Sequence, residues 1–382
     1  MSVATEAERR RLGESFAELC AIPSPSGDEA ACARHVAEEL RRAGVAVESD
    51  VAGNLLARLG EGQGGVLLCA HVDTVPPTAP IEPVLGEDGF WANARPGILG
   101  ADNKAAVAVI LAAVRRLARD GVPVPLEVLF TVAEETALAG AKAFDASRLR
   151  SDFGYVFDHA TPIGEVVLGS PTDFHVRADF RGQAAHAGIR PEDGRSAILA
   201  AARAVASLPQ GRVDPDTTVN AGRIEGGTAI NVVPERCHVD VEVRSLDRDR
   251  AEAMVAEVVD RTYDAANASE TDVDVTVERK FEGYRLKAGT PAVEVARRAL
   301  RARGYEPRPI ASGGGSDANV LVAGGFACVN LANGTERAHQ ADERVSRLNL
   351  EAMLDLLLAL VEEAARELRG APSPALEGAW PA

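Results

Sequence analysis

The sequence has little of what marks several common classes of protein. Its five cysteines are an odd number and no two have C-x-x-C spacing, which argues against a disulfide framework and against a cysteine-built structural zinc site. Aromatic residues are only 4% of the chain, so the core must be built from Ala, Val and Leu. No 18 apolar residues run together, and the N-terminal residues lack an apolar signal segment. We therefore expect a cytoplasmic protein without a membrane span.

Basic residues are also in the minority. The chain has 41 Lys and Arg against 57 Asp and Glu, a net charge of -16. This excess of negative charge argues against nucleic acid or an anionic membrane as a partner. The charge says little about the substrate, because a small site can have a local field of either sign. With 382 residues, 46% of them hydrophobic, the chain can bury the cores of two domains or a little more.

The order of the expected elements predicts an α/β domain that is interrupted by a smaller one. Apolar runs at 66–70, 126–132 and 154–158 alternate with helical stretches, and such runs suit strands of a mostly parallel sheet with helices on both faces. Beyond about residue 172 the strands alternate polar and apolar residues, which is typical of a half-exposed antiparallel sheet. We therefore predict a discontinuous domain of residues 1–171 and 284–382, with an inserted α+β domain of residues 172–283.

Histidine and acidic residues follow the expected strands. The carboxyl ends of parallel strands meet at one edge of a sheet, where ligands collect. One more acid at a helix start and one histidine after the last apolar strand can reach the same edge. The residues of this expected cluster are His71, Asp73, Asp102, Glu134, Glu135, Asp158 and His339.

The side chains of this cluster are of the kinds that bind zinc. Imidazole and carboxylate without thiolate suit Zn²⁺, with Co²⁺ or Mn²⁺ as substitutes. Two histidines and three carboxylates can hold two metal ions if one carboxylate bridges them. A further carboxylate must take the proton of a metal-activated water and deliver it to the leaving amine. The neighbours Glu134 and Glu135 can divide the roles of base and ligand.

Each of these residues has an ordinary explanation when it is taken alone. An isolated histidine such as His71 is more often a capping or core residue than a ligand. Asp102 fits a helix N-cap, and Glu134-Glu135 fits an acidic first turn of a helix. Their joint occurrence at successive strand ends makes a metal site the better interpretation.

The same residues stand in motifs that resemble a known family. HVDT, GADNK, EE after a strand, FD and a late AHQADE are similar, as an ordered set, to the zinc exopeptidase family that includes peptidase T, carboxypeptidase G, acetylornithine deacetylase and the aminoacylases. FRGQAAHAG, NAGRIEGGTAINVVPE, EVRS and SGGGSDANV look most like peptidase T and its relatives. The resemblance covers essentially the whole chain. It implies a catalytic domain with two Zn²⁺ ions and an inserted domain that acts as a lid and as a homodimer interface.

The resemblance also implies which residues bind the metals. His71 and Asp158 would bind one zinc ion, and Glu135 and His339 would bind the other. Asp102 would bridge the two ions.

Two further members of the cluster would act without binding metal. The resemblance implies that Glu134 is the general base. Asp73 would accept the second N–H of the His71 imidazole, as expected of a residue that orients a ligand. The peptide bond Asp102-Asn103 is typically cis in this family.

Residues outside the cluster are implied in substrate binding or catalysis. His186 resembles the family histidine that helps to stabilise the oxyanion, from the partner subunit in several members, although alone it reads as a surface histidine. Arg244 resembles the arginine that binds the substrate's terminal carboxylate, and an exposed strand-end arginine is an equal alternative. The other expected substrate contacts are Asn231, Gly314, Gly315 and Ser316.

The chain departs from the family pattern at two places. Thr136-Ala137 stands where relatives commonly have an aliphatic residue and Gly, and His159-Ala160 replaces a frequent Gly-Gly. His159 can be an outer donor at the metal site, a substrate contact or filler. These changes put a strict tripeptidase specificity in doubt more than the metals.

Three functions are compatible with this set of residues. The first is a dizinc aminopeptidase that acts on short peptides. The second is an amidohydrolase acting on N-acyl or N-carbamoyl amino acids, which would use the same metals and base. The third is a non-catalytic metal-binding relative, and retention of Glu134 argues against it because such a protein has no use for an unliganded base.

Overall fold

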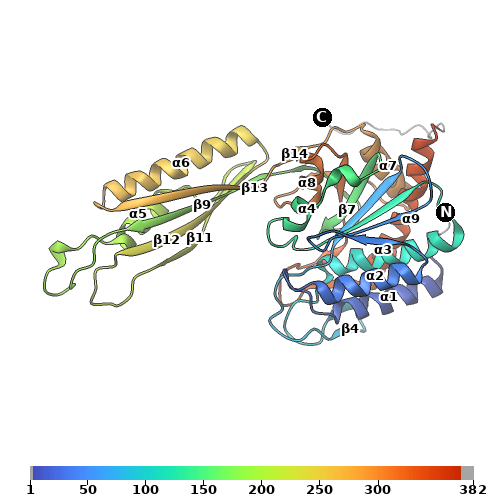
Figure 1. The fold of residues 1–382 in the computed structure, drawn as a ribbon, viewed down its shortest axis with the longest axis horizontal. Coiled ribbons are helices and arrows are strands. Elements are labelled where there is room, and N and C mark those ends of the chain that lie inside the picture. The colour runs from blue at the N-terminus through green and yellow to red at the C-terminus, as the bar shows by residue number, and fades with distance from the viewer. Residues whose placement is uncertain (1–2, 371–382) are drawn as a thin grey trace. The chain divides into compact units, whose positions relative to one another are not determined.

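The computed structural model describes residues 3–370, and the chain divides into two compact units (Figure 1). The first unit comprises Met1–Leu168, Leu286–Ala311 and Ser316–Ala382, of which 371–382 and the first two residues lie outside the described part. The second unit comprises Gly169–Arg285 and Ser312–Gly315.

A mixed sheet of nine strands holds the first unit together, in the order β1-β2-β6-β3-β7-β16-β8-β14 with β15 beside β8. The four central strands β6, β3, β7 and β16 are parallel to one another, whereas β2 and β8 pair antiparallel with their neighbours. The strands are β1 Val47–Ser49, β2 Leu55–Leu59, β3 Val66–His71, β6 Leu126–Thr131, β7 Phe153–His159, β8 Glu165–Ser170, β14 Tyr284–Arg285, β15 Arg308–Ala311 and β16 Cys328–Ala332. The predicted α/β class is confirmed, with the parallel strands at the centre of the sheet and antiparallel strands at its edges.

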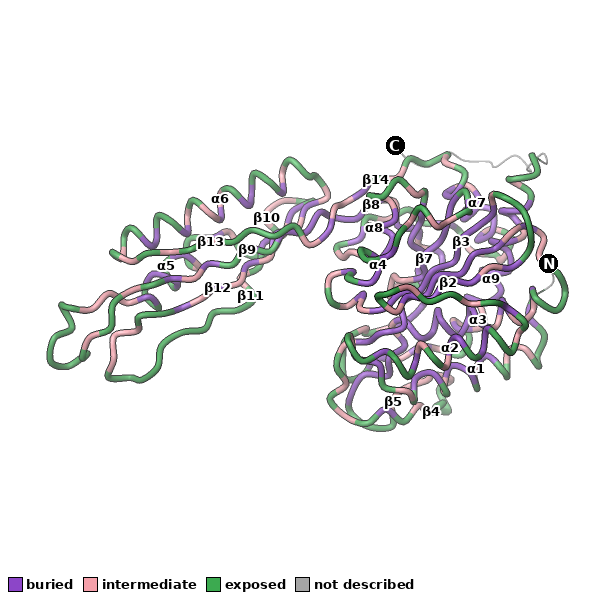
Figure 2. Tube along the Cα trace, in the orientation of Figure 1, coloured by how far each residue is buried: buried purple, intermediate pink, exposed green. Residues whose placement is uncertain are grey.

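The central strands are buried on both faces. Every residue of β3 and of β6 is buried, which is why most residues of these strands are apolar (Figure 2). Alternate side chains such as Leu68, Phe130 and Tyr155 share one core with residues of α1, α2, α3, α7 and α9. The helices are α1 Glu6–Cys20, α2 Ala30–Arg42, α3 Ala101–Asp120, α4 Ala139–Ala143, α7 Pro291–Ala302, α8 Asp317–Ala323 and α9 Arg347–Leu368.

A small antiparallel sheet in the first unit was not predicted from the sequence. Its order is β17-β18-β5-β4, formed by Thr335–Glu336, Arg344–Ser346, Phe90–Asn93 and Pro83–Leu85. Strand β18 pairs with β5 from Arg344 opposite Ala92 to Ser346 opposite Phe90. This sheet joins the segment that follows His339 to the segment that precedes α3.

The second unit is an antiparallel sheet with two helices. The strand order is β10-β11-β12-β9-β13, and helices α5 and α6 share one core with the strands. Along β12 buried residues alternate with half-buried ones, which gives the alternating sequence a packed face and an open face. The elements are β9 Thr172–Arg181, α5 Ala197–Ser207, β10 Gly211–Asp214, β11 Thr217–Gly226, β12 Arg236–Ser245, α6 Arg248–Asn267 and β13 Asp272–Phe281.

Two of the exclusions drawn from the sequence are met by the described residues. All five cysteines are buried as free thiols, so the expectation that they form no disulfide framework is confirmed. None of the helices in residues 3–370 combines the length and the apolar composition that crossing a membrane requires.

Candidate metal centre

The carboxyl ends of three parallel strands bring acidic and histidine side chains together. His71 is the last residue of β3, and Asp158 is the next-to-last residue of β7. Glu134 and Glu135 follow the end of β6, which lies beside β3 in the sheet. Because these strands are parallel, their ends lie at one edge, as the sequence predicted.

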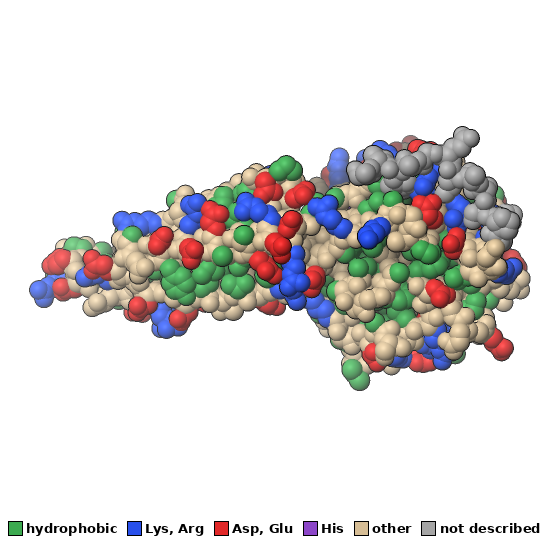
Figure 3. Space-filling view, turned by 90° about the horizontal axis from the view of Figure 1, so that it is seen from above, with side chains coloured by type: hydrophobic (Ala, Val, Ile, Leu, Met, Phe, Trp, Pro, Cys, Tyr) green, Lys and Arg blue, Asp and Glu red, His purple; other side chains and the backbone are tan. Residues whose placement is uncertain are grey.

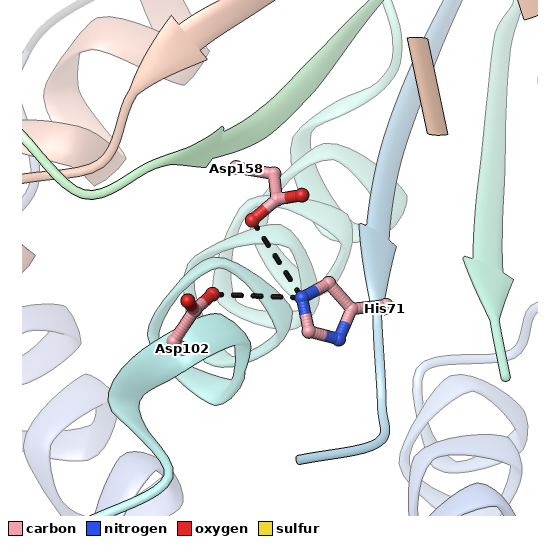
Figure 4. Close-up of side chains that lie close together, drawn as sticks. All are labelled: His71, Asp102 and Asp158. Atoms are coloured by element: carbon pink, nitrogen blue, oxygen red, sulfur yellow. Dashed lines mark ion pairs between the residues drawn. The ribbon is translucent and has the colours of Figure 1, made fainter. Parts of the chain in front are cut away.

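The His71 imidazole faces two carboxylates with the same nitrogen. Its Nε2 lies 3.5 Å from Asp102 Oδ1 and 3.6 Å from Asp158 Oδ1 (Figure 4). The His71 side chain is 2% exposed. Asp102 comes from the first turn of α3, so this contact joins that helix to two strands of the sheet.

His339 faces the other side of Asp102. Its Nε2 lies 2.9 Å from Glu135 Oε1 and 3.5 Å from Asp102 Oδ2. The two oxygens of Asp102 therefore point at different histidines, Oδ1 at His71 and Oδ2 at His339. This is the arrangement that a carboxylate shared between two metal ions requires.

Glu134 completes the cluster from the side of His71. Ligand atoms of His71, Glu134 and Glu135 lie within 4.8 Å of one another. Glu134 is buried, and burial together with the nearby charge of Asp158 raises the pKa of its carboxyl well above the usual value. Such a carboxyl holds a proton more readily than an ordinary glutamate, which suits a group that must accept one during a reaction.

Asp73 holds the cluster together through the backbone. The His71 Nδ1 lies 3.0 Å from the main-chain oxygen of Asp73 and 3.3 Å from its Oδ1. The two carboxylate oxygens also accept hydrogen bonds from the N–H of Glu134 at 3.0 Å and of Glu135 at 3.1 Å. The Ser26 hydroxyl donates a further bond to Oδ2 at 2.7 Å. Asp73 thus contacts both the ligand segment of β3 and the segment after β6.

Electrostatics in the cluster reflect an excess of carboxylates. Burial would lower the pKa of His71, but the charge of Asp158 and the hydrogen bonds of its carboxylate neighbours raise it well above the usual value. Hydrogen bonds to Asp102 and Glu135 raise the pKa of His339 to about 10. Burial raises the pKa of Asp158 to about 7. The raised pKa values mean that these groups bind protons more readily than usual, and a bound metal cation would take the place of those protons.

The residues present fit one or two divalent metal ions. Asp102 Oδ1 and Glu135 Oε1 are buried with a histidine nitrogen facing each, and within residues 3–370 neither oxygen has a hydrogen bond of regular geometry. The ligand atoms available are imidazole nitrogens and carboxylate oxygens, the donors that zinc sites use when thiolate is absent. Buried oxygens without donors are costly unless a cation satisfies them.

The backbone near the cluster has features that sequence reasoning missed. His339 has φ 64° and Ala133, next to Glu134, has φ 51°, a region that non-glycine residues rarely adopt. The N–H of Ala133 donates to Glu29 Oε1 at 3.0 Å. The Asp102-Asn103 peptide bond is cis, as the resemblance implied.

The second unit holds the expected Arg244, which is already paired with carboxylates. Its Nη2 lies 2.8 Å from Glu242 Oε1 and 3.6 Å from Asp173 Oδ2. Its Nη1 donates to the main-chain oxygen of Gly313 at 3.1 Å. Asp173, Glu242 and His175 are close enough to hold a cation, but the Arg244 guanidinium already lies among them. The negative charges of Asp173 and Glu242 offset that of Arg244, so Arg244 would attract a substrate carboxylate less strongly than the sequence implied.

The glycine-rich loop has a packing role in addition to any role at a substrate. A Cβ on Gly315 would come within 2.5 Å of the Phe281 ring, so a larger residue there would have to displace that ring. The Ser170 hydroxyl donates to the Gly314 oxygen at 2.9 Å. Ser316 is buried at the start of α8, where its N–H donates to Asn319 Oδ1 at 3.0 Å.

His186 and Asn231 lie on two paired loops of the second unit. The N–H of Ala187 donates to the Asn231 oxygen at 3.0 Å, and His186 forms a β-bridge with Val232. Both His186 and Asn231 are exposed. The structure therefore places these two predicted residues together, in a different unit from the metal-binding cluster.

The chain is similar to known proteins over nearly its whole length. The profile of peptidase family M20/M25/M40 matches residues 67–363. The crystal structure of the aminopeptidase PepT from Bacillus cereus is 37% identical, with a TM-score of 0.83, over 94% of this chain and 99% of that one. The structure of a tripeptidase from Staphylococcus aureus is 31% identical, with a TM-score of 0.89 and the same coverage. A succinyl-diaminopimelate desuccinylase from Stenotrophomonas maltophilia is 30% identical over 90% of this chain and 96% of that protein.

Proposed function

The chain belongs to peptidase family M20/M25/M40 and is a metallopeptidase, and from this premise we propose that it is a dinuclear zinc aminopeptidase acting on short peptides. The observation that carries the proposal is the placement of Asp102, whose two oxygens face His71 and His339 separately. A single metal ion needs no such division of one carboxylate between two histidines.

These contacts support a division of the ligands between two ions. His71 and Asp158 would hold one Zn²⁺ ion, and Glu135 and His339 would hold the other. Asp102 would be shared. Co²⁺ or Mn²⁺ can substitute, because the donors are nitrogen and oxygen.

The chain's own residues then supply the proton chemistry. Metal ions held by these residues would polarise the carbonyl of the scissile amide and make a water more acidic. Glu134 would accept a proton from the attacking water and pass it to the amine that leaves, and burial, which raises the pKa of its carboxyl, suits a group that must hold this proton between the two transfers. Asp73 keeps the backbone of Glu134 in place while contacting the imidazole of His71.

The second unit would contribute to substrate binding and to assembly. His186 would stabilise the oxyanion, and Arg244, Asn231, Gly314, Gly315 and Ser316 would contact substrate. We also propose that this unit acts as a lid and forms a homodimer. Strand β13 is an edge strand of ten residues, and Val277 on it and Tyr263 on α6 are exposed. Figure 3 shows further apolar side chains, drawn in green, on the surface of the second unit.

The alternative function is hydrolysis of N-acyl or N-carbamoyl amino acids. The similarity to a desuccinylase over 90% of the chain supports it, because that relative acts on an N-acyl compound. Both functions use the same metals and base, so the cluster itself does not separate them. The pairing of Arg244 with Asp173 and Glu242 bears on both, since each substrate class carries a terminal carboxylate.

A substrate panel with metal analysis tests the proposal. The zinc-loaded protein is assayed on di- and tripeptides with a free α-amine, on the same peptides with an acetylated amine, and on N-succinyl and N-carbamoyl amino acids. Cleavage only of free-amine peptides, with two metal ions per chain, supports the aminopeptidase. Preference for blocked amines supports the alternative, and one tightly bound ion at full activity would overturn the dinuclear assignment.

A further inference from the structure

Glu343 is a buried carboxylate close to the metal cluster that has no part in the proposed reaction. The residue is 2% exposed. Its Oε2 accepts hydrogen bonds from the backbone N–H of Leu99 at 2.8 Å and of Gly100 at 2.7 Å. Its Oε1 accepts one from the N–H of Asp102 at 2.8 Å. One side chain therefore binds three backbone donors at the start of α3.

Because Glu343 accepts these hydrogen bonds, the carboxylate of Asp102 does not have to cap the helix and can face a metal ion. The first N–H groups of a helix have no partner within the helix, and a negative charge there is also favoured by the helix dipole. A helix usually meets this need with the side chain of its own N-cap residue, just before the first turn. Here the acid comes from a distant segment, and Asp102 keeps both oxygens directed at His71 and His339.

Glu343 belongs to the segment that carries His339. It stands four residues after His339, in the stretch HQADE. The N–H of Gly97 donates to the Ala341 oxygen at 3.0 Å, and β18 begins at Arg344 and pairs with β5. The loop before Asp102 and the loop after His339 are thus joined by backbone contacts on both sides of the Glu343 carboxylate.

The backbone at His339 needs such support. His339 has φ 64°, in the left-handed region that costs a non-glycine residue free energy, and such a conformation persists only where surrounding contacts hold it. On the other loop, Gly100 adopts φ 75° without such a cost, but it is the N-cap of α3 and has no side chain that could cap the helix.

We propose that Glu343 is a positioning residue of the metal centre, which fixes the backbone of Asp102 to the segment of His339 so that the shared carboxylate and the histidine keep one geometry. The inference rests on the proposed metal site. It gives Glu343, the last residue of the HQADE stretch, a role at the metal centre although Glu343 is not a proposed metal ligand. Residues that orient ligands typically change metal affinity by about 10- to 100-fold when they are replaced.

The substitution Glu343→Gln tests this role selectively. An amide has one acceptor oxygen, so it can keep the bonds to Leu99 and Gly100 only by placing its NH₂ group against the N–H of Asp102. The matched control is Glu127→Gln on β6. Glu127 is 4% exposed, its Oε2 accepts from the N–H groups of Arg150 and Ser151 and its Oε1 from Arg58 Nε at 2.9 Å. Each substitution removes one charge and disturbs one oxygen's contacts.

The measurements are the binding constants of both metal ions, by competition with a chelator, and the visible absorption spectrum of the Co²⁺-loaded protein. We expect Glu343→Gln to bind at least one ion about 10- to 100-fold more weakly and to change the Co²⁺ spectrum. Glu127→Gln should keep the metal-binding constants of the wild type, even if its melting temperature falls by as much as that of Glu343→Gln. Wild-type constants and spectrum in Glu343→Gln would overturn the proposal.

Two further arms keep the outcome clear. If Glu343→Gln does not fold, Glu343→Asp, whose carboxylate is one methylene shorter, replaces it under the same criteria. Failure of the proposed function would appear in the wild-type protein, as fewer than two bound ions or no peptide cleavage. Failure of the Glu343 proposal would appear as equal metal-binding constants and equal Co²⁺ spectra in the variant and in a wild-type protein that binds two ions.

Discussion

The carboxylate of Asp73 accepts a hydrogen bond from the backbone N–H of Glu134 at 3.0 Å. The same residue contacts Nδ1 of His71 through its main-chain oxygen, so one aspartate connects a proposed metal ligand and the proposed base. The role implied by the sequence was narrower, since it concerned only the orientation of His71. The contact with Glu134 makes Asp73 a support for both halves of the site.

Replacing Asp73 with Asn should therefore weaken both metal binding and catalysis. The amide can accept from only one of the two N–H groups, of Glu134 or of Glu135, and it turns its NH₂ group toward the other. We expect kcat to fall by about 10- to 100-fold, with a loss of metal affinity of similar size. The control is Ser26→Ala, which removes only the 2.7 Å bond to Asp73 Oδ2. An effect of Ser26→Ala as large as that of Asp73→Asn would contradict this assignment.

Glu134→Gln should separate catalysis from metal binding. The amide cannot accept the proton of the attacking water, so turnover should fall by about 10²- to 10⁴-fold. Because Glu134 is not among the proposed ligands, metal content measured by atomic emission should remain at the wild-type level. Glu135→Gln provides the comparison, since it alters a proposed ligand whose Oε1 lies 2.9 Å from His339 Nε2 and should lower metal content. Unchanged turnover in Glu134→Gln would refute the role of base.

The sequence predicted the fold class because the central strands are buried on both faces and their residues are mostly apolar. Strands β3 and β6 stand out in this way. Strands β5 and β18 have four and three residues, too short for any periodicity to be recognised. Helix α8, which has seven residues and follows a glycine-rich segment, was not predicted from the sequence.

The cluster of site residues could be expected from the strand ends, whereas its supports could not. His71 and Asp158 follow apolar runs, so parallel strands bring them to one edge. Glu343 bonds to backbone atoms of a segment more than 240 residues away, and no side-chain pattern signals such a contact. The left-handed backbone of His339 is likewise set by tertiary contacts. The pairing of Arg244 with Asp173 depends on strand register, which the sequence does not give directly.

A pH-dependent contribution to stability is expected from Glu39 on α2. Burial opposes its ionisation, but hydrogen bonds from Arg115 and Arg42 hold its pKa below the usual value. The side chain is 4% exposed, and Arg115 Nη2 lies 2.7 Å from Oε2. Replacement of Glu39 by Gln should lower the free energy of unfolding at pH 7 by about 1–3 kcal/mol.

The sign of the pH dependence follows from the lowered pKa. The folded state holds Glu39 ionised more strongly than the unfolded state, so the stabilisation is present above the ordinary glutamate pKa and is lost as the pH falls through the folded value. Denaturant unfolding at pH 7 and below pH 4.5 should show the difference between variant and wild type shrink. Glu38→Gln, an exposed neighbour 3.5 Å from Arg42, should change stability by less than about 0.5 kcal/mol. A difference that grows at low pH would contradict the assignment.

A role of His186 across a dimer interface can be tested by mixing two inactive variants. His186→Ala and Glu134→Ala each lack one component, but a mixed dimer has one subunit with an intact cluster and a partner with an intact His186. If His186 acts on the partner's site, activity should reappear after subunit exchange. Each variant incubated alone is the control. Exchange confirmed by mass spectrometry without recovery of activity would show that His186 does not act on the partner's site.

Metal loading of the apoprotein should release protons and strengthen with pH. The facing carboxylates of Asp102 and Glu135 raise the pKa of His339 to about 10, so this imidazole is protonated at neutral pH without metal. Carboxylate neighbours shift the pKa of His71 in the same direction. A metal ligand must be a neutral imidazole, so binding should release on the order of one proton from His339. Because protons and metal compete, affinity should rise from pH 6 toward pH 9. Calorimetric titration with Zn²⁺ in buffers of different ionisation enthalpy measures the number released. His339→Ala should reduce that number by about one, and a wild-type titration without proton release would show that these histidines are neutral before the metal arrives.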